Sequence, residues 1–374
     1  KASDLKWVEA CAREVAKHAI GHTIVVEKST LPVRTAEVIK SILDDSKLLY
    51  LNKINKSFDV LSNPEFLSEG SAVQDLIEPE RILIGGDNLE AINCLSNLYK
   101  NWVPKEKILL TNIWSSELAK LTANAFLAQR ISSINSISAL CEATGADIRE
   151  VSRAIGLDSR IGSKFLDSSP GFGGSCFKKD ILNLVYLSEY FGLEEVAAFW
   201  NEVVKLNTWH QHRISKLITR KLFGTLSGKK LAILGFAFKS NTNDTRESAA
   251  IQICKDLLEE GAILAIHDPK VKSTQISKDL NMLPNNSYNL NSENSIDSNF
   301  DGKWISIDNI MDAFNGADAA IILTEWLDYA EIKWGEAAAK MRKPAWIFDS
   351  RSIVNPKDVV KAGLKFWRLG DGLG

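Results

Sequence analysis

The first part of the chain alternates between two hydrophobic periods. Apolar residues at Leu5, Val8 and Ala12 begin a series with helical spacing, and short apolar runs with the composition of buried strands follow it. Helical patterns at 32–43 and 88–100 separate these runs. Alternating strands and helices are typical of a parallel sheet covered by helices, so residues 1–113 are predicted to form part of a nucleotide-binding domain. The predicted strands are 23–27, 58–61, 81–85 and 107–111.

The middle of the chain has a helical period and no strand signal. Its longest helical pattern runs from about 115 to 143. Lys120 and Asn124 are four residues apart and share one face of this helix. A helix of this length usually spans a domain centre or joins subunits. We therefore predict an all-helical central domain over residues 114–227. Its further predicted helices are 147–155 and 181–222.

From residue 228 the alternation of strands and helices returns. A helical pattern covers 248–260, and the first strand is followed by GFAFK at 235–239. Its single glycine is a weak sign of a bound nucleotide. We predict a second Rossmann-like domain over residues 228–374, with a loose surface insertion at 272–302 that is rich in Asn, Ser and Asp. The predicted strands are 230–234, 263–267, 319–323 and 345–348.

Residues 171–180 (GFGGSCFKKD) are the stretch most typical of a catalytic site. Their glycines let the backbone pass close to a ligand. The residues after Asp180 have helical spacing, so Cys176 is predicted near a helix N-terminus, where free N–H groups lower the pKa of a thiol. Asp180 lies one turn later on the same face, as a base or orienting partner for a cysteine nucleophile. The alternative is a buried cysteine beside an ordinary glycine loop.

Several other polar residues have two interpretations each. Glu65 and Glu69 follow an Asn-Pro turn, where carboxylates more often cap a helix than catalyse. Lys120 is either a solvated charge or a group that stabilises a developing negative oxygen. Arg160 and Arg351 either clamp a phosphate or form ordinary surface ion pairs.

No metal site is predicted. His210 and His212 are two residues apart on a predicted helix, so they do not face one another, and we interpret both as surface residues. The 5 cysteines are scattered and form no Cys-x-x-Cys pair.

The composition is that of an ordinary soluble globular protein. The chain has 374 residues, of which 45% are hydrophobic and 25% charged. Its formal net charge of −2 argues against nucleic acid or an acidic membrane surface as the main partner. The apolar runs are far shorter than the roughly 20 residues of a membrane span. An odd number of scattered cysteines, with no secretory signal, predicts reduced thiols in a cytoplasmic protein.

The chain resembles a known family, the UDP-glucose/GDP-mannose dehydrogenases, and within it the animal type that acts on UDP-glucose. The resemblance covers essentially the whole chain, and its motifs are long and specific. They are EKSTLPV at 27–33, SNPEFLSEG at 62–70, the long helix at 114–145, GFGGSCFKKD at 171–180, GFAFK at 235–239, DTRES at 244–248 and TEW at 324–326.

The resemblance implies an α/β fold of two Rossmann-like domains joined by a long central helix. The first domain is implied to bind NAD and the second the UDP part of the substrate. The implied reaction converts UDP-glucose, two NAD and water into UDP-glucuronate and two NADH. It also implies a homo-oligomer, a dimer through the central helix or a hexamer of dimers. The implied NAD contacts present in this chain are Ser29, Thr30, Glu69, Cys176, Lys179 and Arg246.

The resemblance also implies catalytic roles. Cys176 attacks the C6 aldehyde to give a thiohemiacetal, which is oxidised to a thioester. Asp180 and Glu65 help water to hydrolyse the thioester, while Lys120 and Asn124 stabilise the oxyanion. Thr30 positions the attacking water. The implied substrate contacts are Glu65, Phe66, Leu67, Glu69, Lys120, Asn124, Arg160, Phe165, Phe172, Gly173, Phe238, Lys239 and Arg351.

The chain departs from the family pattern in places. Residues 1–110 contain no Gly-x-Gly-x-x-Gly turn of the kind that cradles a dinucleotide pyrophosphate, and the chain begins with Lys inside a helical pattern. We therefore expect the first Rossmann domain to be incomplete and to lack its N-terminal part. Ser350 stands where the family usually has glycine, so the turn at 349–351 is expected to differ.

Two alternative functions remain at this stage. One is a truncated, non-catalytic form that binds UDP-sugar and assembles with full-length subunits. The other is a dehydrogenase for a different nucleotide sugar, such as GDP-mannose or a UDP-amino sugar. Replacing Cys176 tests the first alternative, and a substrate panel tests the second.

Overall fold

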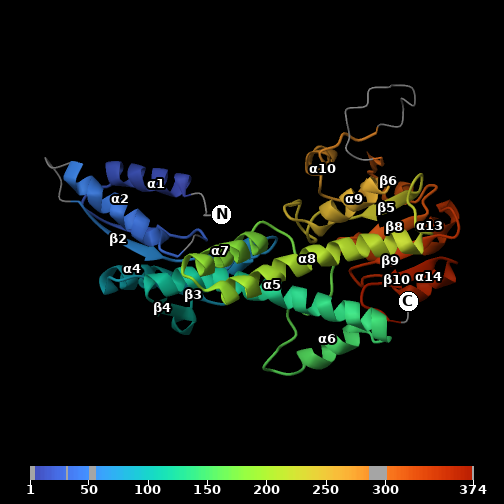
Figure 1. Ribbon diagram of the computed structural model, residues 1–374. Coiled ribbons are helices and arrows are strands. Elements are labelled where there is room, and N and C mark those ends of the chain that lie inside the picture. Colours follow the sequence, from blue (N-terminus) through green and yellow to red (C-terminus); the bar gives the residue numbers. More distant parts are fainter. Residues whose placement is uncertain (1–4, 31–32, 50–55, 286–300, 373–374) are drawn as a thin grey trace. The chain divides into compact units, whose positions relative to one another are not determined.

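The computed structural model describes residues 5–30, 33–49, 56–285 and 301–372, except for the side chains of 46–49. The chain divides into two compact units (Figure 1). The central helices are shared between the units, so the predicted three-domain division stays a prediction. Unit 1 consists of Lys1–Phe126 and Asp180–Trp200, and unit 2 of Leu127–Lys179 and Asn201–Gly374.

Unit 1 contains a sheet with the strand order β1-β2-β3-β4. β1 pairs with β2 in parallel, and so does β3 with β4, whereas β2 and β3 pair antiparallel at Ser62 and Gly85. The short apolar runs predicted each strand to within one residue at either end. The strands are β1 (His22–Glu27), β2 (Ser57–Ser62), β3 (Ile82–Gly85) and β4 (Ile108–Thr111).

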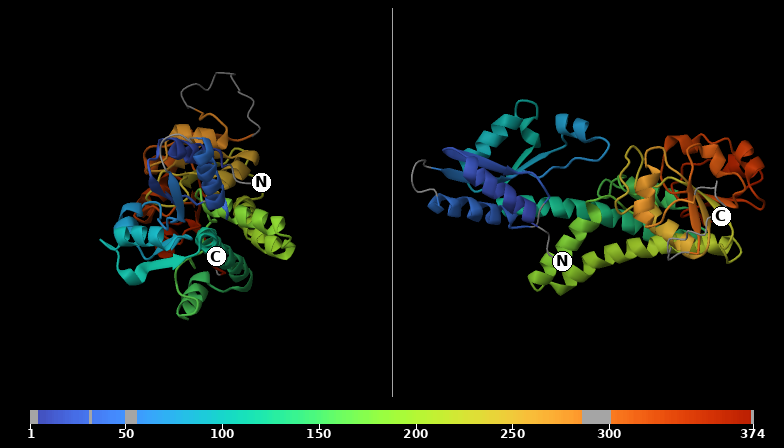
Figure 2. Two further views of the ribbon diagram at one scale, coloured as in Figure 1. Left: turned by 90° about the vertical axis from the view of Figure 1, so that its left-hand side faces the viewer. Right: turned by 90° about the horizontal axis from the view of Figure 1, so that it is seen from above.

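Alternate residues of β2 pack against different helices. Phe58 and Val60 belong to a core with α1 and α2, whereas Leu61 packs with α4, as the two-residue period of a strand requires. α1 and α2 run side by side, drawn in blue (Figures 1 and 2). α2 extends past its predicted end at 43. The helices are α1 (Lys6–His18), α2 (Thr35–Leu49), α3 (Ala72–Ile77) and α4 (Leu89–Tyr99).

The middle segment is helical as predicted, but the stretch predicted over 181–222 consists of two helices, separated at residues 191–193. The longest, α5, is one continuous helix of 32 residues, drawn in teal in Figures 1 and 2. No strand lies between residues 112 and 229, all of which the structure describes. Throughout the described ranges, no helix combines the length and apolarity needed to cross a membrane. The helices are α5 (Ile113–Thr144), α6 (Ile148–Gly156), α7 (Phe177–Tyr190) and α8 (Glu194–Lys221).

Unit 2 contains a six-stranded parallel sheet with the order β10-β9-β8-β5-β6-β7. In chain order this is the doubly wound arrangement of a Rossmann fold, as predicted. The strand order reverses between β5 and β8, and such folds bind ligands at the carboxyl ends of the strands beside this switch point. The strands are β5 (Lys230–Leu234), β6 (Ile263–His267), β7 (Lys303–Ser306), β8 (Ala319–Ile322), β9 (Trp346–Asp349) and β10 (Lys365–Arg368).

The prediction of a loose insertion over 272–302 is wrong in its first part. α10 (Ser273–Leu280) forms there, with Ile276 and Leu280 buried in the core of unit 2. These two residues are one helical turn apart, a signal that the polar composition of the whole segment hides. Residues 286–300 of the predicted insertion lie outside the described residues. The other helices of unit 2 are α9 (Ala249–Glu259), α11 (Ile310–Ala313), α12 (Leu327–Ala330), α13 (Trp334–Lys340) and α14 (Pro356–Lys361).

Candidate functional site

In unit 1, polar side chains meet at the carboxyl ends of β1 and β2. Lys28 Nζ donates to Asn63 Oδ1 at 3.2 Å and lies 3.7 Å from the Glu65 carboxylate. The Tyr99 hydroxyl donates to the same Asn63 oxygen at 2.6 Å, and Asn63 Nδ2 donates to the Leu83 carbonyl at 2.7 Å. These bonds fix the turn that carries Glu65. The carboxylate of Glu65 thus pairs with the lysine that directly follows the neighbouring strand, β1.

Two side chains of α5 point at groups from other elements of unit 1. Lys120 is only 8% exposed, and its Nζ lies 5.1 Å from the centre of the Phe66 ring. The interpretation of Lys120 as a solvated charge is therefore wrong. One turn later, Asn124 Nδ2 donates to Asp180 Oδ2 at 2.6 Å, and both side chains are buried. A short hydrogen bond to a carboxylate is among the stronger kinds, so Asn124 fixes the orientation of Asp180.

Cys176 directly precedes α7, and Asp180 lies in the first turn of that helix. The predicted helix start and the one-turn spacing are confirmed. The side chain of Cys176 is exposed, so the alternative of a buried structural cysteine is wrong. Its Sγ lies 3.5 Å from the hydroxyl of Ser175.

The glycine loop before Cys176 packs against other parts of unit 2. A Cβ on Gly173 would lie 2.6 Å from the Glu247 carbonyl oxygen and 2.8 Å from Phe238 Cβ, so a larger residue does not fit. Asn207 on α8 accepts the Phe172 N–H at 2.9 Å and donates to the Phe172 carbonyl at 3.1 Å. The structure therefore brings together three predicted substrate contacts, Phe172, Gly173 and Phe238.

Arg246 is held beside the same loop. Its carbonyl accepts the Gly174 N–H at 2.8 Å. Its guanidinium binds the Asp244 carboxylate, with Nε and Nη2 at 2.9 and 2.7 Å. Lys178 pairs with the neighbouring Glu247 at 2.8 Å. The DTRES motif thus contacts the cysteine loop through both backbone and side chains.

The chain itself occupies the backbone donors at the switch point of the unit 2 sheet. Gly235 follows β5 with φ of 96°, and a Cβ there would lie 2.4 Å from Thr324 Cβ, so glycine is required. The Asp268 carboxylate accepts the N–H groups of Phe236 and Ala237 at 2.7 and 3.0 Å. Free N–H groups after such a turn bind phosphate in other nucleotide folds. Here they are already bonded to Asp268.

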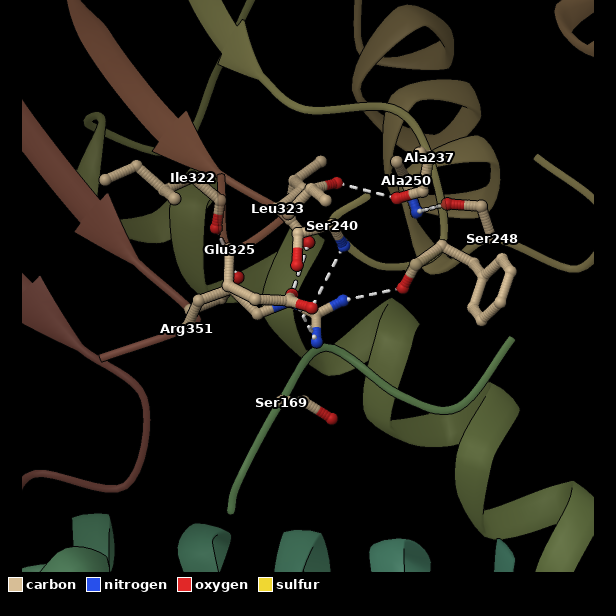
Figure 3. Close-up of polar contacts among 12 residues, drawn as sticks. Ser169, Ala237, Ser240, Ser248, Ala250, Ile322, Leu323, Glu325 and Arg351 are labelled. Carbon is tan, nitrogen blue, oxygen red and sulfur yellow. Dashed lines mark hydrogen bonds and ion pairs between the residues drawn. The ribbon is translucent and has the colours of Figure 1, made fainter. Parts of the chain in front are cut away.

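Arg351 joins the carboxyl ends of β5, β8 and β9 (Figure 3). Its Nε donates to the Leu323 carbonyl at 2.8 Å, and its Nη2 donates to the Phe238 carbonyl at 3.1 Å. Nη1 lies 3.1 Å from the Glu325 carboxylate, which also accepts the Ser240 N–H. Burial lowers the pKa of the Arg351 guanidinium, and Glu325 opposes this shift. With 13% of its side chain exposed, Arg351 is not an ordinary surface ion pair.

Ser350 lies in the turn 349–351, where the sequence predicts a departure from the family pattern. Its buried hydroxyl donates to the Ile322 carbonyl, a bond that glycine does not make. The Asp349 carboxylate accepts the N–H groups of Arg351 and Val354, at 3.0 and 2.9 Å, and closes the turn. Burial raises the pKa of this carboxyl group, and these N–H donors oppose the shift.

The structure does not bring every predicted residue into these clusters. Arg160 is exposed and binds Asp158 through its guanidinium at 2.6 Å, which is the surface-pair interpretation. Ser29 and Thr30 lie two and three residues after the end of β1. Leu67 and Glu69 lie in the segment before α3. The roles of these residues stay predictions, as do those of Phe165, which is 40% exposed, Lys179, which is exposed, and Lys239, whose Nζ lies 5.6 Å from the Phe238 ring.

Sequence reasoning missed several supporting residues. The prediction that His210 is a surface residue is wrong, because it is fully buried with Nε2 3.0 Å from the Ser169 carbonyl. Burial lowers the pKa of His210 to about 3. Asn207 lies three residues earlier on the same helix, and a polar pair at helical spacing is a weak signal for this supporting role. Glu325 lies inside the TEW motif but carries no signal that pairs it with Arg351. In the described part of the chain, no group of three or more His, Cys, Asp or Glu is placed to hold a metal ion.

Comparison with known proteins identifies the family. A UDP-glucose 6-dehydrogenase of Gallus gallus is 52% identical over 360 residues, which cover 95% of this chain and 70% of the relative. The chain belongs to the UDP-glucose/GDP-mannose dehydrogenase family. Three profiles of this family match: the NAD binding domain over residues 1–103, the central domain over 114–209 and the UDP binding domain over 232–356.

Further members of this dehydrogenase family agree. A UDP-glucose 6-dehydrogenase of Drosophila melanogaster is 49% identical over 374 residues, covering 99% of this chain and 76% of the relative. Among solved structures, a UDP-glucose dehydrogenase from the archaeon Pyrobaculum islandicum superposes with a TM-score of 0.81 at 30% identity, covering 99% of this chain and 76% of that one. The α/β fold is that of this dehydrogenase family.

The family profiles also bear on the first domain. The NAD binding domain profile matches from residue 1 to residue 103. This match gives no support to the expectation that the first Rossmann domain is incomplete. It does support NAD as the cofactor of unit 1.

Proposed function

We propose that this chain is an NAD-dependent oxidoreductase that converts UDP-glucose into UDP-glucuronate in two oxidations. The observation that carries the proposal is the pairing of Asn124 with Asp180 in the first turn of the helix that Cys176 precedes. This fixed carboxylate sits beside a cysteine loop that matches the family motif. Relatives with about half their residues identical are UDP-glucose 6-dehydrogenases.

The cofactor is NAD, and the residues at the end of β1 fit it. β1 and β2 are parallel, so their carboxyl ends lie at the same edge of the sheet. α/β folds bind dinucleotides at this edge, and Ser29 and Thr30 come just after the carboxyl end of β1. The proposed contacts of NAD are Ser29, Thr30, Glu69, Cys176, Lys179 and Arg246. When bound, NAD supplies the hydride acceptor for both oxidations.

Cys176 is the nucleophile of the reaction. Its sulfur adds to the aldehyde carbon at C6, which forms a C–S bond and a thiohemiacetal. After the second oxidation this carbon is a thioester. Water then adds to it, the C–S bond breaks, and the thiolate returns to Cys176 as the carboxylate product leaves. A two-stage route through a covalent intermediate lets one site carry out both oxidations and the hydrolysis.

Other residues of the chain act on charges and protons. Lys120 and Asn124 donate to the oxygen that becomes negative when sulfur or water adds to C6. Asp180 takes a proton from the attacking water, with Glu65 as its helper and Thr30 positioning the water. The low exposure of Lys120 supports this role, because a buried cation stabilises a developing anion better than a solvated one.

The UDP part of the substrate binds at the switch point of the unit 2 sheet. The UDP binding domain profile covers 232–356, which includes this point. Phe238 and Arg351 are the proposed anchors there, with Lys239, Phe172 and Gly173 beside them. Arg160 and Phe165 complete the proposed substrate contacts of unit 2, and Glu65, Phe66, Leu67 and Glu69 those of unit 1.

Assembly and location complete the proposal. The chain forms a homo-oligomer through α5, where Leu118, Phe126 and Leu140 are 43%, 56% and 57% exposed. It works in the cytoplasm. Analytical ultracentrifugation of the full chain tests the oligomer, and a monomer at micromolar concentration would contradict it.

The experiment that tests the function is a substrate panel. The full chain is incubated with NAD and with UDP-glucose, GDP-mannose or a UDP-amino sugar, and the NADH and sugar acid are measured. We expect NADH and UDP-glucuronate from UDP-glucose and much less product from the others. Preference for another sugar nucleotide contradicts the proposed substrate.

A further inference from the structure

Two buried carboxyl groups of unit 1 lie at the two ends of the connection from β1 to α2. The first is Glu117 on α5, only 3% exposed. Its Oε2 accepts the Arg34 N–H at 2.7 Å and its Oε1 accepts the Ala36 N–H at 2.9 Å. One carboxylate therefore binds two backbone donors where α2 begins, and it comes from a different element.

The backbone that Glu117 binds is in a conformation that needs support. Arg34 has φ of 78°, in the left-handed region that a side chain other than glycine rarely adopts. Its guanidinium lies 5.6 Å from the ring centre of Trp114 and 5.8 Å from that of Phe191. Because such a conformation persists only when its surroundings over-determine it, the Glu117 bonds are a direct cause of this turn.

Glu27 is the second buried carboxyl group, at the last residue of β1. It is 7% exposed and accepts the Ser29 N–H. Its Oε1 has no hydrogen-bond partner among the described residues. Burial and the neighbouring Glu117 raise the pKa of Glu27 to about 8, whereas Lys28 and the Ser29 N–H oppose the shift. At neutral pH the Glu27 carboxyl group therefore keeps its proton, and it does not repel the carboxylate of Glu117.

We propose that Glu27 and Glu117 are positioning residues, which hold Ser29 and Thr30 in place by binding the backbone at Ser29 and, after Thr30, at Arg34 and Ala36. Glu27 fixes the start of the connection through Ser29, and Glu117 fixes its end through Arg34. Lys120 and Asn124 follow Glu117 by about one and two turns on α5. The bonds from Glu117 to Arg34 and Ala36 therefore link the segment that carries the proposed NAD-binding residues to α5, the helix that carries the proposed oxyanion donors. This inference rests on the proposed function, in which Ser29 and Thr30 bind NAD.

The direct test is hydrogen exchange at the backbone amides of Ser29, Arg34 and Ala36 in the full chain. Glu117→Gln replaces one acceptor oxygen by an N–H₂ group, which faces a backbone N–H and cannot accept from it. We expect exchange at Arg34 or Ala36, whichever faces the N–H₂ group, to become at least about tenfold faster, as for loss of a hydrogen bond to a charged group. The matched control is Glu37→Gln on α2, whose carboxylate is half exposed and lies 3.9 Å from Arg34 Nε. It should leave exchange unchanged.

A second pair of variants uses the protonated state of Glu27. Glu27→Ala should speed exchange at Ser29, and Glu27→Gln should restore it, because an amide matches the neutral carboxyl group. If Glu117→Gln does not fold, the exchange of Ser29 in these two Glu27 variants still tests the proposal. In addition, Arg34→Gly adopts the left-handed φ without strain, so it should slow the fast exchange of Ala36 when combined with Glu117→Gln.

Kinetics then separate positioning from general loss of structure. In Glu117→Gln we expect KM for NAD to rise about tenfold, the effect of losing one charge-assisted hydrogen bond, while KM for UDP-glucose changes little. If both KM values rise equally, or if Glu117→Gln and Glu37→Gln exchange alike, the positioning role is overturned. If the wild-type chain makes no NADH, the proposed function fails instead, and the exchange results still decide whether the two carboxyl groups hold the segment.

Discussion

Arg351 provides the sharpest test of the unit 2 structure. Arg351 follows β9, and its guanidinium contacts the segments after two other strands: the Leu323 carbonyl and the Glu325 carboxylate after β8, and the Phe238 carbonyl after β5 (Figure 3). Arg351→Met keeps an apolar stem of similar length and removes only the charged donors. We expect the carboxyl ends of β5 and β8 to loosen, because they lose the group that bonds to both.

The size of the effect follows from burial. Removing one partner of a buried ion pair costs about 3–5 kcal/mol. The Glu325 side chain keeps 32% of its surface exposed, although Oε2, the oxygen that pairs with Arg351, is itself buried. Because the rest of the side chain is solvated, we take the lower end of this range, about 3 kcal/mol, which corresponds to a roughly 100-fold change in an equilibrium constant.

Hydrogen exchange of peptides that cover β5 and β8 measures this loss of stability in the full chain. Amides that exchange only through opening of unit 2 should exchange about 100-fold faster in Arg351→Met. The matched control is Arg160→Met, because Arg160 is exposed and binds only the nearby Asp158 in the contacts described above; it should leave these peptides unchanged. Combining Glu325→Gln with Arg351→Met should recover part of the lost stability, because the double variant leaves no unpaired carboxylate at this position. Exchange in Arg351→Met within about threefold of wild type would refute the reasoning.

Two further predictions concern the cysteine loop and the buried carboxyl groups. Gly173→Ala forces a Cβ to within 2.6 Å of the Glu247 carbonyl oxygen, so we expect a loss of about 1–3 kcal/mol in calorimetric affinity for UDP-glucose, whereas Gly335→Ala, whose Cβ meets nothing within 4 Å, should have no effect. Affinity unchanged in Gly173→Ala would show that the loop adjusts. Burial raises the pKa of Glu27 from 4.5 to about 8, so native unit 1 retains a proton that the unfolded chain releases in this range. Its stability should fall as pH rises from about 5 to 8 and then level off, and Glu27→Gln should flatten the slope of chemical denaturation against pH. An equal slope in both proteins would contradict the raised pKa.

Much of the fold was predictable because its signals are local. Each strand of unit 1 is a short apolar run, and α7 begins where the apolar spacing after Asp180 predicts it. β7 and β10 were not predicted, since four-residue strands such as Lys365–Arg368 carry mixed polarity. α10 was hidden because Ile276 and Leu280 lie in a polar segment.

The residues of the proposed site can be named from the sequence, but their hydrogen-bond partners cannot. The motif around Cys176 contains both the proposed nucleophile and Asp180, which are neighbours in sequence. Asn124 bonds to Asp180, 56 positions away in the chain, and Arg351 pairs with Glu325, 26 positions away, so no local pattern encodes either contact. The burial of Glu27 and Glu117 was missed for a related reason, because the sequence does not distinguish a buried glutamate from one on the surface.

The central claim is tested most directly by counting NADH per UDP-glucose consumed, in the wild-type chain and in Cys176→Ser. The account predicts two NADH for each sugar in the wild type, and a loss on the order of 1000-fold or more in the variant, as when a covalent nucleophile is removed. It also predicts that Cys176→Ser still binds UDP-glucose, because the proposed UDP contacts are unchanged. One NADH per sugar in the wild type, or full turnover in the variant, would contradict the thioester route.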